Sequence, residues 1–157
     1  MEYIYQIKQI GYVNNNKVSS IHLDEAYIPG LKNIEGYSHL HIICWGHLCD
    51  TSEYRAGLVK EKLFKKGPEK IGVFATRSPA RPNPIMVSII EVNYVDYENG
   101  VIYTPFIDVA HETPVIDIKP YNLMDRVREC NGPDWCNNWP QWHEGSSSFN
   151  WSNEITS

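Results

Sequence analysis

Long apolar runs and targeting signals are missing from this sequence of 157 residues. Its most apolar stretch, Ile42 to Trp45, is flanked by His41 and His47, whereas a membrane-spanning helix needs roughly 20 apolar residues. We therefore expect no membrane helix. The opening residues, MEYIYQIKQ, have no basic region followed by an apolar stretch, so we expect no secretory signal and a cytoplasmic location.

Cysteine is scarce, with four residues at positions 44, 49, 130 and 136. In a reducing compartment they are expected to be free thiols rather than disulfides. Cys130, Cys136 and His143 cluster in the sequence, but their spacings do not fit the usual pairs of zinc ligands. We therefore expect no metal site.

Positive charge is in deficit, because 14 Lys and Arg face 19 Asp and Glu and give a net charge of −5. A protein that binds polyanions broadly gains affinity by releasing counterions from many phosphates, and this balance argues against such a protein. Any contact with nucleic acid must then be local. The candidate patch comprises Lys60, Lys62, Lys65, Lys66 and Lys70, followed by Arg77 and Arg81. Stretches rich in lysine are usually solvated faces, and that is the preferred reading of this one.

Glycines with the spacing of a dinucleotide-binding loop are also missing. Rossmann-type methyltransferases hold their cofactor with a G-x-G turn after the first strand, and here no two of the ten glycines lie two residues apart. If this chain binds a nucleotide-like cofactor, it must do so with another arrangement.

The segments that are present favour strands over helices. Apolar, β-branched and aromatic residues dominate six segments, and His39–Trp45 is apolar enough for a strand buried on both faces. The triplet Asn14-Asn15-Asn16 predicts a turn, and Asn99-Gly100 predicts a hairpin. The expected strands are Glu2–Val13, Val18–Leu23, His39–Trp45, Ile71–Ala75, Ile85–Val95 and Val101–Ile107.

One segment, Ser52–Lys66, has the composition of a helix, and no alternation of strands with helices is visible. We predict a mainly β fold, a small antiparallel β-barrel or highly curved sheet with short helical or irregular insertions, over residues 1–129. Residues 130–157 are expected to form an irregular tail rich in Trp. Its tryptophans are predicted to pack against the barrel or a partner subunit, and the alternative is stacking on RNA bases.

The most unusual stretch, Gly72–Ile85, places three prolines and two arginines between two apolar segments. Proline fixes its own backbone and pushes its predecessor towards extended structure, so this loop is stiff. A stiff loop presents Arg77 and Arg81 as preorganised guanidinium groups for a carboxylate or a phosphate. The alternative is a structural turn whose arginines pair with acidic neighbours.

A second group lies in Thr113–Tyr121, where strand-like alternation places Asp117, Lys119 and Tyr121 on one face. A carboxylate, an amine and a phenol side by side can exchange protons, so these three are the candidate catalytic residues. The alternative is an Asp–Lys ion pair at a sheet edge.

Three stretches, GVFATRSPARPNPI, ETPVIDIKPY and EGYSHL, together resemble the TsaA-like family of tRNA methyltransferases, and the similarity spans about Ile10 to Tyr121. The resemblance implies a single-sheeted β-barrel that binds S-adenosylmethionine without a Rossmann fold and works as a homodimer. It also implies methylation of N6 of threonylcarbamoyladenosine beside the tRNA anticodon.

The resemblance also assigns site residues by position. Cofactor contacts fall on Ser38, His39, Arg77, Val87, Phe106, Ile107 and Asp108. Acceptor contacts are expected from Arg81, Asn83 and His111.

The chain departs from the family pattern in places that affect the acceptor more than the cofactor. A Ser-Pro-Tyr contact segment is replaced near Asn15, Asn16 and Lys17, Asp-Gly is replaced by His111-Glu112, and a glycine expected to line the site is replaced by Met86. Two alternatives to tRNA methylation follow: a methyltransferase for a small molecule or another RNA, and a module that binds the cofactor without transferring its methyl group.

Overall fold

A computed structural model describes residues 3–156, and contacts divide them into two compact units. The first contains the described residues up to His47 together with Ile85–Leu123, and the second contains Leu48–Pro84 together with the described residues from Met124 onward. The expected boundary after residue 129 stays a prediction.

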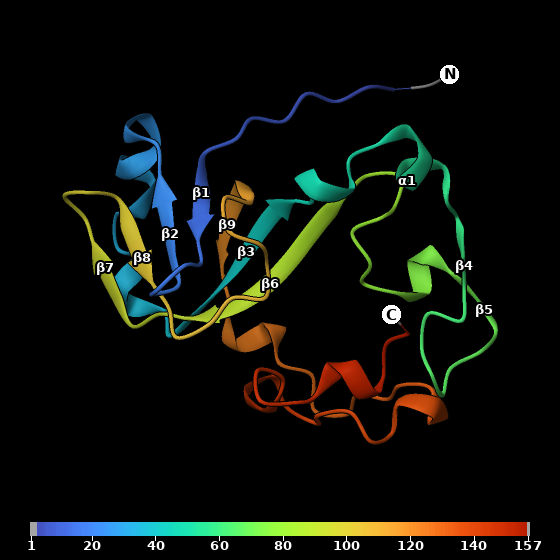
Figure 1. The fold of residues 1–157 in the computed structure, drawn as a ribbon. Coiled ribbons are helices and arrows are strands. Elements are labelled where there is room, and N and C mark those ends of the chain that lie inside the picture. Colours follow the sequence, from blue (N-terminus) through green and yellow to red (C-terminus); the bar gives the residue numbers. More distant parts are fainter. Residues whose placement is uncertain (1–2, 157) are drawn as a thin grey trace. The chain divides into compact units, whose positions relative to one another are not determined.

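The first unit is built on a seven-stranded sheet in which every pair of neighbours is antiparallel (Figure 1). The strand order is β6-β3-β9-β1-β2-β8-β7. The mainly β, antiparallel prediction is confirmed, but within the described residues no pairing joins the outer strands β6 and β7, so a closed barrel is not confirmed. The strands are β1 Gly11–Asn14, β2 Ser20–Leu23, β3 His39–Trp45, β6 Ile85–Glu91, β7 Tyr94–Asp96, β8 Val101–Tyr103 and β9 Pro114–Pro120.

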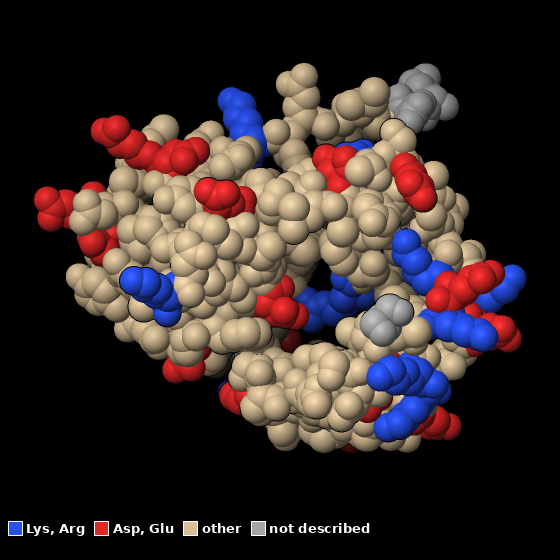
Figure 2. Space-filling model, viewed as in Figure 1, with Lys and Arg blue, Asp and Glu red and all other residues tan. Residues whose placement is uncertain are grey.

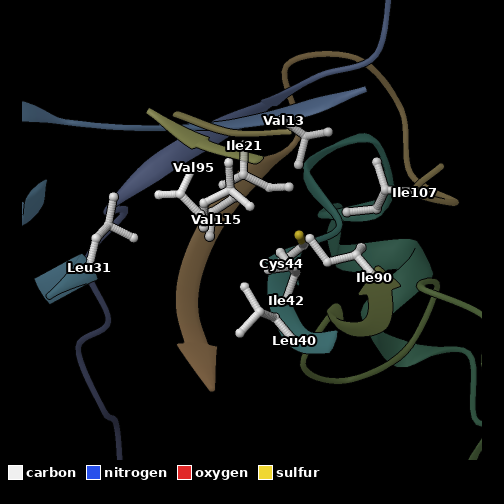
Figure 3. Packing of buried hydrophobic residues seen from close by; sticks show 11 residues of the cluster. Val13, Ile21, Leu31, Leu40, Ile42, Cys44, Ile90, Val95, Ile107 and Val115 are labelled. Carbon is white, nitrogen blue, oxygen red and sulfur yellow. The ribbon is translucent and has the colours of Figure 1, made fainter. Parts of the chain in front are cut away.

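One face of this sheet carries the core. Leu40, Ile42 and Cys44 of β3 are fully buried and point the same way, and Ile90 of β6 and Val115 of β9 join them (Figure 3). The residues between them on β3 are only half-buried, so the expectation of a strand buried on both faces is wrong. Burial raises the pKa of the Cys44 thiol to about 12, because the thiolate would lose its hydration.

Both predicted turns are confirmed. Asn14 is the last residue of β1, and Asn15-Asn16 begin the turn to β2. Asp96 closes the β7–β8 hairpin by accepting a hydrogen bond from the backbone N–H of Asn99 at 3.0 Å. Gly100 adopts a φ of 68°, and a Cβ added there would lie 2.5 Å from a carbon of Ile28. The hairpin therefore needs glycine both for its backbone and for its close contact.

Several predicted elements are shorter than expected. The part of Glu2–Val13 that the structure describes is strand only from Gly11, and the apolar side chains of residues 3–7 are exposed. Ile71–Ala75 divides into the end of a strand and a 3-10 turn, and Val101–Ile107 is strand only to Tyr103. Apolar composition alone does not mark where the backbone leaves the sheet.

The second unit contains one α-helix and a two-stranded sheet. The predicted helix Ser52–Lys66 is correct only for α1, Ser52–Ala56, which starts where the Thr51 hydroxyl accepts a hydrogen bond from the backbone of Tyr54. The remaining residues, 57–66, include β4, Val59–Glu61, which pairs with β5, Lys70–Gly72. The 3-10 helices of the chain are Glu25–Leu31, Ile34–Gly36, His47–Cys49, Val73–Ala75, Leu123–Asp125, Asp134–Cys136, His143–Gly145 and Trp151–Asn153.

The irregular tail packs on the segment after β4. The ring of Phe64 stacks on Trp135 with centroids 4.8 Å apart, and Trp139 lies edge-on to Phe64, Trp135 and Trp151. Beside these rings, Glu154 is 5% exposed, and its carboxylate accepts hydrogen bonds from Asn138 at 2.7 Å and Trp139 at 3.2 Å. The tail therefore has an aromatic cluster of its own around a buried carboxylate.

Two further findings concern sequence expectations. All four cysteines are free. Along residues 3–156 we find no helix that combines the length and the apolar character needed to cross a bilayer.

Candidate functional site

The outer face of strands β6, β3 and β9, which is the face opposite the core, brings together most of the chemistry of the first unit. On β3, His41 pairs with Ile89 of β6 and with Lys119 of β9. One step along, Ile43 pairs with Val87 on one side and Asp117 on the other. Since paired residues share a face, these side chains form two rows across the outer face.

The register of β9 against β3 contains one irregularity. Cys44 pairs with Val115 and Ile43 pairs with Asp117, so Ile116 is an extra residue without a partner in this register. The alternation predicted from the sequence is present beyond this bulge, which places Asp117 and Lys119 on the outer face.

Asp117 and Lys119 form an ion pair, with Nζ 2.8 Å from Oδ2. The other carboxylate oxygen, Oδ1, accepts a hydrogen bond from the backbone N–H of Ile118 at 2.9 Å. The Lys119 and Asp117 side chains are 65% and 48% exposed, so the pair contributes little to stability and both groups are accessible to a ligand. The ion pair of the alternative reading is therefore present. It lies on a strand that pairs with β3 at Asp117 and Lys119, and with β1 at Pro114 and Val115.

Aromatic rings continue this face beyond the ion pair. The ring of Tyr121 lies 5.3 Å from the ring of His41 and 6.3 Å from that of His39. Nδ1 of His39 is within 2.9 Å of the Ser38 hydroxyl, at the point where β3 begins. Sequence reasoning missed His41, although counting every second residue from His39 would have placed it on the same face.

The segment from Phe106 to Glu112 is tied to the turn after β1. The amide of Asn15 donates hydrogen bonds to the carbonyls of Ile107 at 3.1 Å and Val109 at 2.8 Å. Nδ1 of His111 accepts from the backbone N–H of Asn15 at 3.2 Å, and Nε2 lies 3.0 Å from the amide of Asn16. Two of the departures from the family pattern are therefore in contact.

The predicted site residues of this segment differ in exposure. The side chain of Ile107 is 1% exposed in the core, so only its backbone is available to a ligand, whereas Phe106 is 43% exposed and Asp108 is exposed. Met86 is half-buried and packs against the core cluster, on the opposite side of β6 from Val87. This differs from the expectation that Met86 lines the site.

The proline-rich loop lies in the second unit, and its rigidity comes from more than proline. The guanidinium of Arg81 donates to the carbonyl of Thr76 at 3.1 Å and lies 6.0 Å from the centre of the Phe74 ring. The Thr76 hydroxyl in turn donates to the carbonyl of Val73 at 2.8 Å. Arg81 therefore braces the loop from inside through backbone carbonyls, and not through the acidic neighbours that the structural alternative expected. Arg77 and Asn83 are exposed.

The predicted site residues thus divide between the two units. Arg77, Arg81 and Asn83 lie in the second unit. The other ten lie in the first: Ser38, His39, Val87, Phe106, Ile107, Asp108, His111, Asp117, Lys119 and Tyr121. Among residues 3–156, no group of three or more His, Cys, Asp or Glu side chains is arranged to hold a metal ion.

A shallow groove elsewhere in the first unit contains none of these residues. Ile28, Lys32, Glu35 and Tyr97 are among the residues that line it, and the Tyr97 hydroxyl donates a hydrogen bond to the Glu35 carboxylate. This bond lowers the pKa of Glu35 and raises that of Tyr97.

Known proteins resemble this chain in both sequence and fold. Residues 7–125 match the family described as tRNA-methyltransferase O N-terminal domain. A probable S-adenosyl-L-methionine-binding protein of Methanocaldococcus jannaschii is 35% identical over 124 residues, which are 76% of this chain and 94% of that protein.

Other relatives are longer than the region they share with this chain. A probable S-adenosyl-L-methionine-binding protein of Pyrococcus abyssi is 39% identical over 66% of this chain and 52% of its own length. A human tRNA (adenine(37)-N6)-methyltransferase is 40% identical over 64% of this chain and 24% of its own length. This chain thus spans about half of the first protein and about a quarter of the second.

Solved structures agree on the fold. Two crystal structures of TrmO from Pseudomonas aeruginosa align with TM-scores of 0.65 and 0.62, at 23% and 24% identity. They cover 85% and 82% of this chain and 62% of each TrmO chain. On the match over residues 7–125 and the shared fold, this chain belongs to the TsaA-like family, the family of the tRNA-methyltransferase O N-terminal domain.

Proposed function

We propose that this chain is an S-adenosylmethionine-dependent methyltransferase that methylates N6 of threonylcarbamoyladenosine next to the tRNA anticodon. The observation that carries the proposal is the outer face of β9, where the ion pair of Asp117 and Lys119 is exposed in a member of this family. Names of relatives that refer to S-adenosyl-L-methionine binding and to tRNA adenine methylation support the cofactor and the substrate.

The chemistry of each residue assigned to the cofactor, taken singly, supports this proposal. Arg77 offers an exposed guanidinium for the methionine carboxylate, and Asp108 offers an exposed carboxylate for the ammonium or a ribose hydroxyl. Val87, 42% exposed on the outer face, offers apolar surface for the adenine. When bound, the cofactor supplies a methyl group on a sulfonium.

The role of this chain's own residues is then to hold the acceptor and to take a proton from its N6. That nitrogen is amide-like and a poor nucleophile, so removing its proton assists the transfer. Within the ion pair, Lys119 orients the Asp117 carboxylate, which is the group that accepts the proton. Tyr121 continues the same face and is assigned to positioning the acceptor, together with Asn83 and His111, whereas Arg81 is assigned to bracing its own loop.

The proposal also includes a barrel, a homodimer and a cytoplasmic location for this chain. The open strands β6 and β7 are proposed to curve towards a barrel, and two copies are proposed to associate. Exposed Ile85 on the outer strand β6 supports an apolar contact with a second copy. A cytoplasmic location is proposed because the proposed substrate is tRNA.

Mass spectrometry of tRNA nucleosides tests the function. A strain that lacks the gene is expected to lose methylated threonylcarbamoyladenosine, and expression of this chain is expected to restore it. An unchanged nucleoside profile would contradict the proposal. A module that binds the cofactor without transfer, which the names of the archaeal relatives favour, would show cofactor affinity by calorimetry and no restored methylation.

The catalytic assignment gives a sharper test. Replacing Lys119 with Ala is expected to lower turnover by at least about 10²-fold, because the Asp117 base loses the partner that orients it and a positioned base contributes about 10²- to 10⁴-fold. Cofactor affinity measured by calorimetry is expected to be retained. Lys8→Ala, which removes the same charge from an exposed position of the same unit, serves as the control. Wild-type turnover in Lys119→Ala would remove the ion pair from the mechanism.

A further inference from the structure

Charge is distributed very unevenly along this acidic chain. Residues 55–81 contain eight of the 14 Lys and Arg but only two of the 19 Asp and Glu, a net charge of +6. The remainder contains six basic and 17 acidic residues, a net charge of −11. Such segregation within one chain indicates a local surface for an anionic partner.

The structure folds much of this basic segment into the β4–β5 hairpin. Glu61 of β4 is directly opposite Lys70 of β5, and the two side chains approach to 3.4 Å. Lys62 follows β4 and lies 3.9 Å from Glu69. Figure 2 shows Lys and Arg side chains gathered, with Asp and Glu between them, over the part of the molecule where Figure 1 draws these two strands.

These two ion pairs are open to solvent. The exposed fractions of the Lys62, Glu69, Lys70 and Glu61 side chains lie between 68% and 76%. Exposed pairs of this kind contribute roughly 0–1 kcal/mol, so a phosphate can replace the glutamate as the partner of either lysine at little cost.

The segment after β4 is held in place by the tail. The backbone N–H of Lys65 donates to the carbonyl of Glu154 at 2.8 Å, and Nζ of Lys65 donates to the carbonyl of Ser152 at 2.7 Å. Lys66 lies 3.3 Å from the buried Glu154 carboxylate. A hairpin whose connecting loop is anchored presents its remaining lysines without a large ordering cost on binding.

We propose that the β4–β5 hairpin, with Lys62 and Lys70 as its contact residues, binds the sugar-phosphate backbone of the RNA substrate. The inference deepens the proposed function, on which the identity of the RNA as tRNA rests. Counterion release from phosphates supplies affinity at the hairpin, and the acidic remainder of the chain disfavours other approaches. Recognition here depends on backbone charge and not on base sequence.

The test measures how the affinity of the full chain for tRNA depends on salt. Fluorescence anisotropy is recorded for wild type, for Lys62→Gln with Lys70→Gln, and for the control Lys8→Gln with Lys32→Gln. The control removes the same two charges from exposed positions of the other unit. The plot of log affinity against log salt concentration is expected to become shallower by about 2 in the hairpin variant, since each lost phosphate contact removes about 0.9. The control slope is expected to match wild type.

The outcomes separate this inference from the proposed function. Equal slopes for the hairpin and control variants would overturn the hairpin as an RNA surface, even if wild type methylates tRNA. Loss of binding to poly-glutamate with unchanged tRNA binding would overturn it in favour of an acidic protein partner. A wild-type chain that transfers no methyl group but shows the slope difference would refute the proposed function and leave the RNA surface standing.

Discussion

At the scale of single residues, Glu112 shows how the chain tolerates a departure from its family. Glu112 adopts a φ of 60°, in the left-handed region that favours glycine, at the position where the family pattern has glycine. Its backbone N–H donates to the carbonyl of Val13 at 2.8 Å, which ties this turn to β1. The backbone of the glycine turn is therefore kept while the side chain has changed, at a cost in strain.

Replacing Glu112 with Gly is expected to raise the free energy of unfolding by about 0.5–1 kcal/mol, because relief of left-handed strain exceeds the chain entropy that glycine adds. Urea denaturation measures the change. Asn33→Gly, at a φ of 65°, is the matched control and should give a smaller gain, since Asn tolerates this region. Destabilisation of Glu112→Gly would mean that the glutamate side chain contributes more than its backbone strain costs.

Residue roles were predictable where they follow from strand alternation. Asp117 and Lys119 were expected on one face and lie there. Side chains two residues apart share a face of a strand wherever the strand begins or ends. The internal role of Arg81 was only one of two readings, since its bond to the Thr76 carbonyl depends on how the loop turns. The core-facing side of Met86 follows from its pairing with Cys44, which the sequence alone does not reveal.

At the scale of elements, the tail depends on one carboxylate. Hydrogen bonds from Asn138 and Trp139 and the ion pair with Lys66 lower the pKa of Glu154 from its ordinary value of 4.5. The unfolded chain therefore takes up this proton at a higher pH than the folded tail does. The stabilisation is present above pH 4.5 and is lost as the pH falls through the lower folded pKa.

We expect the Trp fluorescence of the tail to report loosening as the pH falls below this ordinary value. In Glu154→Gln, the tail should already be less stable at neutral pH and should lack this acid-dependent step. Glu144→Gln, an exposed carboxylate in the same tail, is the control and should keep the step. An identical acid profile in Glu154→Gln and wild type would contradict the role of this carboxylate.

Element boundaries were harder to predict than element types. The strand His39–Trp45 was predicted with its observed ends, because its apolar and aromatic residues stop at Ser38 on one side and Gly46 on the other. The expected helix Ser52–Lys66 ended at Ala56, where Gly57 follows and the next residues pair as β4 with β5. That pairing joins residues across a loop, and helix propensity within one segment contains no information about it.

At the scale of the whole molecule, two compact units with separate apolar clusters should not unfold as one. Ile42 is fully buried in the core of the first unit, whereas the Trp cluster belongs to the second. Replacing Ile42 with Ala is expected to destabilise the first unit by about 2–5 kcal/mol through the cavity it leaves.

Hydrogen exchange of the β3 and β9 amides measures the first unit, and Trp fluorescence in a Trp45→Phe background measures the second. In Ile42→Ala, exchange should accelerate while the fluorescence transition stays in place. Equal shifts of both signals would show a single cooperative transition instead. The mainly β class was predictable from composition, but the division into two units was not, because each unit combines segments distant in the sequence.

The unpartnered Ile116 sets which way the neighbouring acid points. With an uninterrupted ladder, Ile43 would face Ile116, and Asp117 would fall opposite Ile42, among the fully buried side chains. The bulge at Ile116 thus exchanges the two faces for the residues that follow it, and the Asp117 carboxylate faces solvent and not the apolar core. Deleting Ile116 would therefore make the ladder regular and leave Asp117 opposite Ile43, whereas regular pairing of the full-length strand would bury the charge.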